Sequence, residues 1–311
     1  MRKFWLIGIL IFSSPGFAAI DQAELCARDY FNAHRPVAVV AMVRPERATP
    51  HSDGLVLTPR VEGFDNLANF NRRMGAAIDQ SEDAIAYRLN HGMGTDAALL
   101  WRNLQEIGNV RHAVESERLK AAGKSYQNQY GVTTNLSVED YISKENRFRA
   151  FYDRAEKFVA DAPHGIYLSK PITNPNPKGT RPTFPTSGFI KRGEVIAVIH
   201  PNGKVSEQMR DEALEILARA TANPKLTAEQ FLIEAAKAHF LMMHGTPFEN
   251  GSPACVLALV ESIYKAKYHK SLGRMKPGVE IFWKAIFLGA EGEIGYQKFV
   301  REYPSYFEPG K

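Results

Sequence analysis

Apolar residues recur at helical spacing through most of the chain. Three stretches place them three and four positions apart, the spacing that gathers side chains on one face of an α-helix: residues 64–78, 97–114 and 145–159. Ser137 and Asp140, three positions apart, have the pattern of a helix start ahead of the last stretch. The pattern predicts a helical body between residues 63 and 162, with the turn Asn90–Asp96 between two of its helices.

The helical period stops at the segment 169–188, where proline and glycine are too frequent for a helix or a central strand. Two short apolar runs follow on either side of Arg192-Gly193, and we expect them to form a β-hairpin over Gly188–Ile199. Helical spacing then returns to the end of the chain. The predicted helices are Ser206–Ala220, Thr227–His244, Ser252–Tyr268, Gly278–Leu288 and Gly292–Tyr303.

Two of these helices have clear start signals. Thr227 and Gln230 make a capping box, in which each side chain binds the other residue's backbone amide. Ser252 is the predicted N-cap of the next helix, and Pro253 stands at the first helical position, where a missing amide costs least.

The first residues have the pattern of a secretory signal peptide. Arg2 and Lys3 precede an apolar run, and Gly16 and Ala18 are small residues around a cleavage point after residue 18. A buried N-terminal helix is the alternative. Export predicts a periplasmic or secreted protein with no membrane span after cleavage. Residues 36–43 have the pattern of a buried strand.

Composition excludes several classes of protein. Removing residues 1–18 takes away two basic residues and no acid, so the net charge falls from +5 to +3. With no Lys/Arg runs, that balance argues against nucleic acid as a partner. Cys26 and Cys255 are too few and too far apart for a disulfide framework, and we expect both to be free. No metal-binding spacing occurs, so no metal is expected.

The loop His244–Val256 is the main candidate for chemistry. Two long helices with apolar faces flank it and must pack together, which places the loop at one end of the pair. The amides of Ala254 and Cys255, at the start of the second helix, form an expected anion site. A plain helix hairpin is the alternative. His239 falls on the apolar face of the first helix, as a core residue or as part of the site.

The order of hairpin, amphipathic helix, helix with His239, loop and second helix resembles the Fic/Doc (Fido) fold. Pro247, Phe248 and Gly251 match the family's loop motif, and His239 matches its upstream histidine. Four other motif positions differ: the histidine is Thr246, the asparagine Ser252, the second glycine Pro253 and the arginine Ala254.

The pattern over residues 231–299 is more similar to the AvrB-like branch of that superfamily, whose members lack the motif histidine. This resemblance implies a mostly α fold with three parts: a signal peptide over 1–18, a mainly helical region with a proline-rich connection over 19–180, and a Fido-like core with a small hairpin flap over 181–311. It also implies a bacterial effector that uses a nucleotide or nucleotide sugar as co-substrate, with no tightly bound cofactor.

The implied reaction is transfer of a sugar to a hydroxyl of a target protein. Threonine does not ionise usefully near neutral pH, so Thr246 cannot replace the histidine base that adenylylation requires. In sugar transfer the anomeric carbon becomes positively charged as the diphosphate leaves, so a weaker base is sufficient for the attacking hydroxyl. Fic-type adenylylation and a non-catalytic binding module remain the alternatives.

Site roles follow from the resemblance. The diphosphate would be held by Asn250, Gly251, Ser252 and Ala254. Lys191 or Arg192 on the hairpin would close over it as a cationic clamp, or would simply be solvated charges. His244 or His200 would act as base, although a solvent-facing helix end explains His244 equally well.

Overall fold

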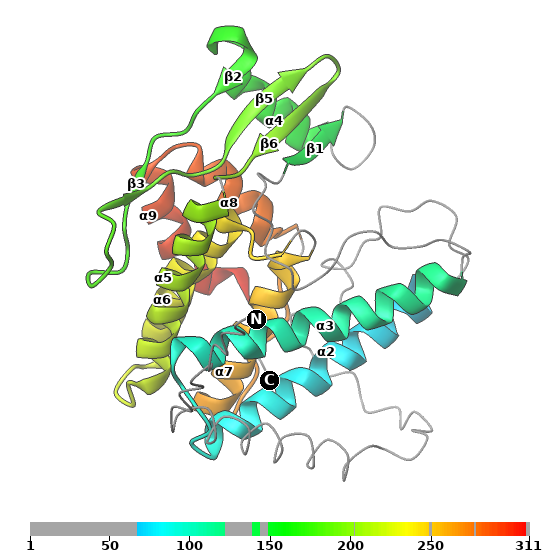
Figure 1. The fold of residues 1–311 in the computed structure, drawn as a ribbon, viewed down its shortest axis with the longest axis vertical. Helices are drawn as coiled ribbons and strands as arrows, with labels where there is room; N and C mark the ends of the chain where they lie inside the picture. The colour runs from blue at the N-terminus through cyan, green and yellow to red at the C-terminus, as the bar shows by residue number, and fades with distance from the viewer. Residues whose placement is uncertain are drawn as a thin grey trace, which may run out of the picture. The chain divides into compact units, whose positions relative to one another are not determined.

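The computed structural model describes residues 67–121, 139–143, 149–201, 203–248, 251–276 and 278–308. The predicted signal peptide, Cys26, the predicted strand 36–43 and Asn250 lie outside these residues. The described chain is mostly helical with a small antiparallel sheet, as the sequence predicts (Figure 1). Within it, no helix is both long and apolar enough to cross a bilayer.

The helices and strands follow one another in an order close to the predicted one. The helices are α2 (Leu67–Asn90), α3 (Ala97–Ala121), α4 (Arg149–Val159), η3 (Pro163–Gly165), α5 (Gly203–Ala222), α6 (Ala228–Gly245), α7 (Ser252–Tyr268), α8 (Ile281–Gly289), α9 (Glu293–Glu302) and η4 (Tyr303–Tyr306). The strands are β1 (Glu139–Ser143), β2 (Ile166–Tyr167), β3 (Ile172–Thr173), β4 (Thr183–Phe184), β5 (Gly188–Arg192) and β6 (Val195–Ile199).

Strands β5 and β6 form the predicted hairpin, with Gly188 paired to Ile199 at its base and Arg192 paired to Val195 at its tip. They lie in the middle of a four-stranded antiparallel sheet of order β1-β6-β5-β2. Phe189, Ile196 and Val198 share one face of this sheet and are buried in an aromatic cluster with side chains of α4 and α8.

The predicted helix start at Ser137 and Asp140 is wrong. Residues 139–143 form β1, which pairs with β6, and the helix begins only at Arg149. Pairing with β6 satisfies a whole row of backbone groups on both strands, and this outweighs the local capping signal. By contrast, the turn at Asn90–Asp96 joins α2 to α3 as expected.

The capping box of α6 is present in both directions. Thr227 Oγ1 accepts from the Gln230 backbone at 3.2 Å, and Gln230 Oε1 accepts from the Thr227 backbone at 3.0 Å. The predicted start of α7 is displaced by one residue, because Gly251 rather than Ser252 is the N-cap. Helix α5 begins at Gly203, three residues earlier than predicted.

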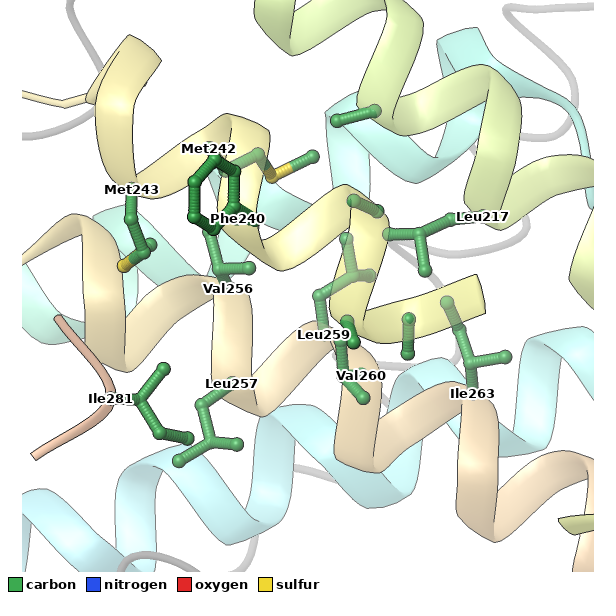
Figure 2. Close-up of a cluster of buried hydrophobic side chains, with 14 of the residues drawn as sticks. Leu217, Phe240, Met242, Met243, Val256, Leu257, Leu259, Val260, Ile263 and Ile281 are labelled. Carbon is green, nitrogen blue, oxygen red and sulfur yellow. The ribbon is translucent and has the colours of Figure 1, made fainter. Parts of the chain in front are cut away.

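The main hydrophobic core lies between α6 and α7. Figure 2 shows Phe240, Met242 and Met243 of α6 and Val256, Leu259 and Ile263 of α7 in this core. Helices α2 and α3 pack on α7, and α5 packs on α6, with their buried side chains in the same cluster. Helices α2 and α3 therefore share one core with elements that follow residue 180.

We expect Leu259→Ala to lower the free energy of unfolding by roughly 2–5 kcal/mol, because Leu259 is fully buried and its loss leaves a cavity. Leu168→Ala is the control, since this leucine is 76% exposed and should change stability by less than about 0.5 kcal/mol. Denaturant unfolding of both variants measures the difference. Equal effects would contradict the placement of the core.

Candidate functional site

The loop between α6 and α7 is closed by its own hydrogen bonds. Ser252 Oγ accepts from the Phe248 backbone amide and donates to the Phe248 carbonyl, both at 2.9 Å. The Phe248 ring is buried, stacks on Trp101 of α3 with ring centroids 5.8 Å apart, and faces Gly108. Ser252, predicted as the helix cap, holds the loop together instead.

The Arg111 guanidinium lies beside the N-terminus of α7 and adds its charge to the partial positive charge of the helix end. Gly251, the N-cap, has φ 78°, a left-handed conformation that glycine adopts without strain, and it offers no side chain to cap the first turn. Nη1 of Arg111, from α3, donates to the Gly251 carbonyl at 3.3 Å. The guanidinium lies so close that a Cβ on residue 251 would be 2.5 Å from Nη1.

This geometry corrects the predicted set of open amides. The Cys255 amide donates to the Gly251 carbonyl at 3.1 Å, because the helix begins one residue earlier than expected. Pro253 has no amide to offer. Of the two predicted amides, that of Ala254 remains, and the Ser252 amide and the Arg111 guanidinium lie at the same helix end. Cys255 itself is buried and forms no disulfide.

The other end of the loop borders a shallow pocket. Its lining comes from α5 and from the end of α6 with the start of the loop: Gly203, Ser206, Glu207, Arg210, Gly245, Thr246 and Pro247. Thr246 has φ 33°, which turns the chain sharply at the position of the motif histidine. The Arg210 guanidinium lies 4.4 Å from the centre of the Trp101 ring. Trp101 thus contacts both the pocket wall and Phe248.

His200 and His244 meet in a buried cluster that the sequence did not predict. Ser187 Oγ is 2.9 Å from Nδ1 of each histidine, and the Ser187 amide donates to His244 Nδ1 at 3.0 Å. His200 Nδ1 also lies 3.3 Å from the His244 carbonyl, which assigns a proton to that nitrogen. Ser187 then accepts from His200 and donates to His244.

Neither of these histidines is open to a substrate in this structure. His244 is fully buried and His200 is 3% exposed, so the alternative of a solvent-facing helix end for His244 is wrong. Burial, with a smaller contribution from the neighbouring His200, lowers the pKa of His244 to about 3. Its ring packs directly on Gly289 of α8. The cluster joins the base of the β5–β6 hairpin to the end of α6.

His239 is a core residue. Its ring is fully buried, and its Nδ1 is 2.8 Å from the hydroxyl of Tyr303 in η4. Burial lowers the pKa of His239 to about 3, so the imidazole is neutral near pH 7. This position agrees with the core interpretation rather than with a role in the loop.

The two basic residues of the hairpin lie at its tip, whereas its base faces α6. Lys191 Nζ forms an ion pair with Glu156 of α4 at 2.9 Å, and Arg192 is the last residue of β5. The described contacts thus bring Lys191 to α4. Arg111 lies at the α7 end of the loop, and sequence reasoning missed it because it is 140 residues away from Gly251 along the chain.

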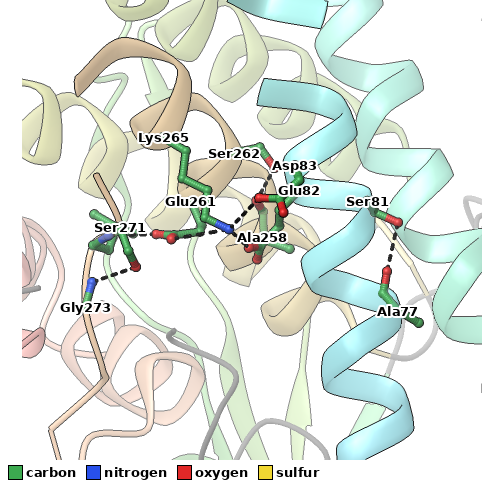
Figure 3. Close-up of polar contacts among 11 residues, drawn as sticks. Ala77, Ser81, Glu82, Asp83, Ala258, Glu261, Ser262, Lys265, Ser271 and Gly273 are labelled. Carbon is green, nitrogen blue, oxygen red and sulfur yellow. Dashed lines mark hydrogen bonds and ion pairs between the residues drawn. The ribbon is translucent and has the colours of Figure 1, made fainter. Parts of the chain in front are cut away.

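A second group of charges lies between α2 and α7, and its members Glu82 and Glu261 are fully buried (Figure 3). Lys265 Nζ lies 2.8 Å from Glu82, 3.4 Å from Asp83 and 3.8 Å from Glu261. Glu261 Oε2 also accepts from the Leu272 amide at 2.9 Å. Burial and the neighbouring Glu82 carboxylate raise the pKa of Glu261 to about 7. The cluster fixes α2 on α7.

Comparison with known proteins does not extend this description. No protein-family model and no curated protein matches the chain. Among the described residues, no group of three or more His, Cys, Asp or Glu side chains could hold a metal ion.

The raised pKa of Glu261 gives a pH-dependent prediction. Between its usual value of 4.5 and about 7, the folded protein keeps a proton that the unfolded chain releases, so wild-type stability falls as pH rises through this range. Glu261→Gln removes this effect. Its stability relative to wild type should rise by on the order of 1–3 kcal/mol from about pH 4.5 to pH 7.

Chemical denaturation of both proteins at several pH values measures this difference. The buried His239 and His244 titrate with the opposite sign, but they are present in both proteins and cancel in the difference. Glu229→Gln, at an exposed position at the start of α6, is the control and should show no such trend. A difference that does not vary with pH would contradict the raised pKa.

Proposed function

We propose that the chain is an exported Fido-like transferase. It binds a nucleotide sugar at the loop between α6 and α7 and moves the sugar to a hydroxyl of a target protein. The observation that carries this proposal is the Arg111 guanidinium beside the glycine-capped N-terminus of α7. The order of hairpin, α5, α6, loop and α7 supports the same assignment.

Arg111 and the helix end together favour a phosphate-bearing ligand. A helix N-terminus carries partial positive charge, and a guanidinium placed against it is stabilised when an anion lies between them. Arginine also matches the geometry of phosphate oxygens through paired N–H donors. The Ser252 and Ala254 amides would complete the donor set toward a diphosphate.

A sugar donor is favoured over a nucleotidyl donor because of Thr246. A hydroxyl does not accept a proton near neutral pH, and adenylylation needs a base at this position. In glycosyl transfer the positive charge that develops at the anomeric carbon makes the reaction less dependent on a strong base. The helix end would then stabilise the leaving diphosphate.

A non-catalytic binding module is the second candidate. The burial of His200 and His244 favours it, because neither predicted base reaches the loop surface in this structure. Such a module would still bind the phosphate-bearing ligand. The two candidates therefore differ in turnover and not in affinity.

We expect UDP-glucose, GDP-mannose or dTDP-glucose to raise the melting temperature of the mature chain, since ligand that binds only the folded state stabilises it. Arg111→Gln should weaken this binding about 10- to 100-fold, the range for loss of a hydrogen-bonded charge. Calorimetric titration with the stabilising nucleotide measures the affinity.

The matched control is Arg219→Gln, which makes the same charge change. Arg219 lies in the last turn of α5, about 24 Å along the helix from Gly203, the residue at which α5 begins beside the loop. It should bind like wild type. If none of the three sugar nucleotides stabilises the chain, the proposed donor class is wrong. Stabilisation by ATP alone would favour adenylylation. Equal loss of affinity in both variants would mean that Arg111 acts only through net charge.

Gly251→Ala tests the helix end directly. The added Cβ would meet Arg111, and φ 78° strains any residue with a side chain. We expect loss of detectable sugar transfer by intact-mass analysis of an acceptor protein, and a cost in stability of about 1–2 kcal/mol. Gly75→Ala, where a Cβ meets nothing within 4 Å, is the control. Transfer that persists in Gly251→Ala would exclude this loop as the site.

A further inference from the structure

A carboxylate lines the pocket beside the position of the missing motif histidine. Gly203, Ser206, Glu207 and Arg210 are spaced as one face of α5, and this face forms one wall of the pocket. Thr246 and Pro247 of the loop form the opposite part of the lining. Glu207 is therefore the acidic residue of the pocket, beside the residue that replaces the family's base.

Glu207 differs from its polar neighbours in the pocket, because their side chains have hydrogen-bond or ion-pair partners. Arg210, one turn along the helix, forms an ion pair with Asp211 at 2.8 Å and lies over the Trp101 ring. Ser206 Oγ donates to the Pro201 carbonyl at 2.9 Å. Among the described residues, Glu207 has neither a hydrogen bond nor an ion pair. It is only partly exposed and lines the pocket together with Arg210.

We propose that Glu207 is the proton acceptor of the transferase, in place of the motif histidine. The oxygen of the acceptor hydroxyl forms a bond to the anomeric carbon of the sugar. The bond from that carbon to the diphosphate oxygen breaks, and its electron pair leaves with the diphosphate. The proton of the hydroxyl moves to the Glu207 carboxylate. In the absence of an acceptor protein, water takes the same place and the donor is hydrolysed.

This assignment rests on the proposed function, but it uses a different part of the loop. Arg111 and Gly251 lie at the α7 end, where the diphosphate would bind, whereas Glu207 and Thr246 lie at the α6 end. Trp101 connects the two ends, since it contacts Arg210 on one wall and Phe248 in the loop. Donor binding and proton transfer are thus assigned to separate residues and are measured separately.

The test compares Glu207→Gln with wild type and with Glu229→Gln, which removes an exposed carboxylate at the start of α6. Release of nucleoside diphosphate from UDP-glucose, GDP-mannose and dTDP-glucose measures turnover, and calorimetry measures binding of the same nucleotides. We expect Glu207→Gln to lower kcat by 100-fold or more, in the range of general-base catalysis, with unchanged affinity and melting temperature.

Three results would overturn the assignment, and they can be told apart. Turnover by Glu207→Gln at the wild-type rate overturns the role of Glu207 and leaves the transferase proposal standing. Equal loss in Glu229→Gln shows that the effect is not specific to the pocket. Wild-type protein that binds a sugar nucleotide without ever releasing the diphosphate overturns both proposals and leaves the binding module.

Discussion

Helices α6 and α7 are the centre of the structure, because each is apolar over most of its surface and leaves water only by packing on its neighbours. The same core takes in α2 and α3, which pack on α7, and α5, which packs on α6, so five helices share it. The short connection between α6 and α7 is consequently held at one end of the pair. Phe248 is buried against α3, and Ser252 is bonded to the Phe248 backbone, so the two described ends of this connection are held together. A helix start held in this way can keep its backbone amides in place for a ligand.

The electrostatics of the loop come from parts of the chain that are distant in sequence. Arg111 of α3 contributes a cation beside the start of α7, and Glu207 of α5 contributes an anion beside the end of α6. The two charges occupy opposite ends of one connection. In a transferase this separation is useful, since the leaving group requires positive charge and the attacking hydroxyl requires a proton acceptor.

Local patterns predicted local features well. The capping box at Thr227, the hairpin at Gly188–Ile199 and the turn after Asn90 depend on neighbouring residues, and the structure confirms all three. The strand at 139–143 could not be predicted, because it forms by pairing with β6, more than fifty residues later. Arg111 and Ser187 were missed for the same reason: an arginine in a helical repeat and a serine in a proline-rich stretch have no distinguishing local pattern. The burial of His244 likewise depends on α8, which follows it by about forty residues.

The anchoring of the β5–β6 hairpin has a consequence for how such a sequence can vary. Ser187 precedes one strand, His200 follows the other, and both bind His244, so the base of the hairpin is tied to the end of α6. Insertions or replacements around Arg192-Gly193 leave those bonds intact. A change at Ser187, His200 or His244 therefore alters the contacts of the other two positions at once.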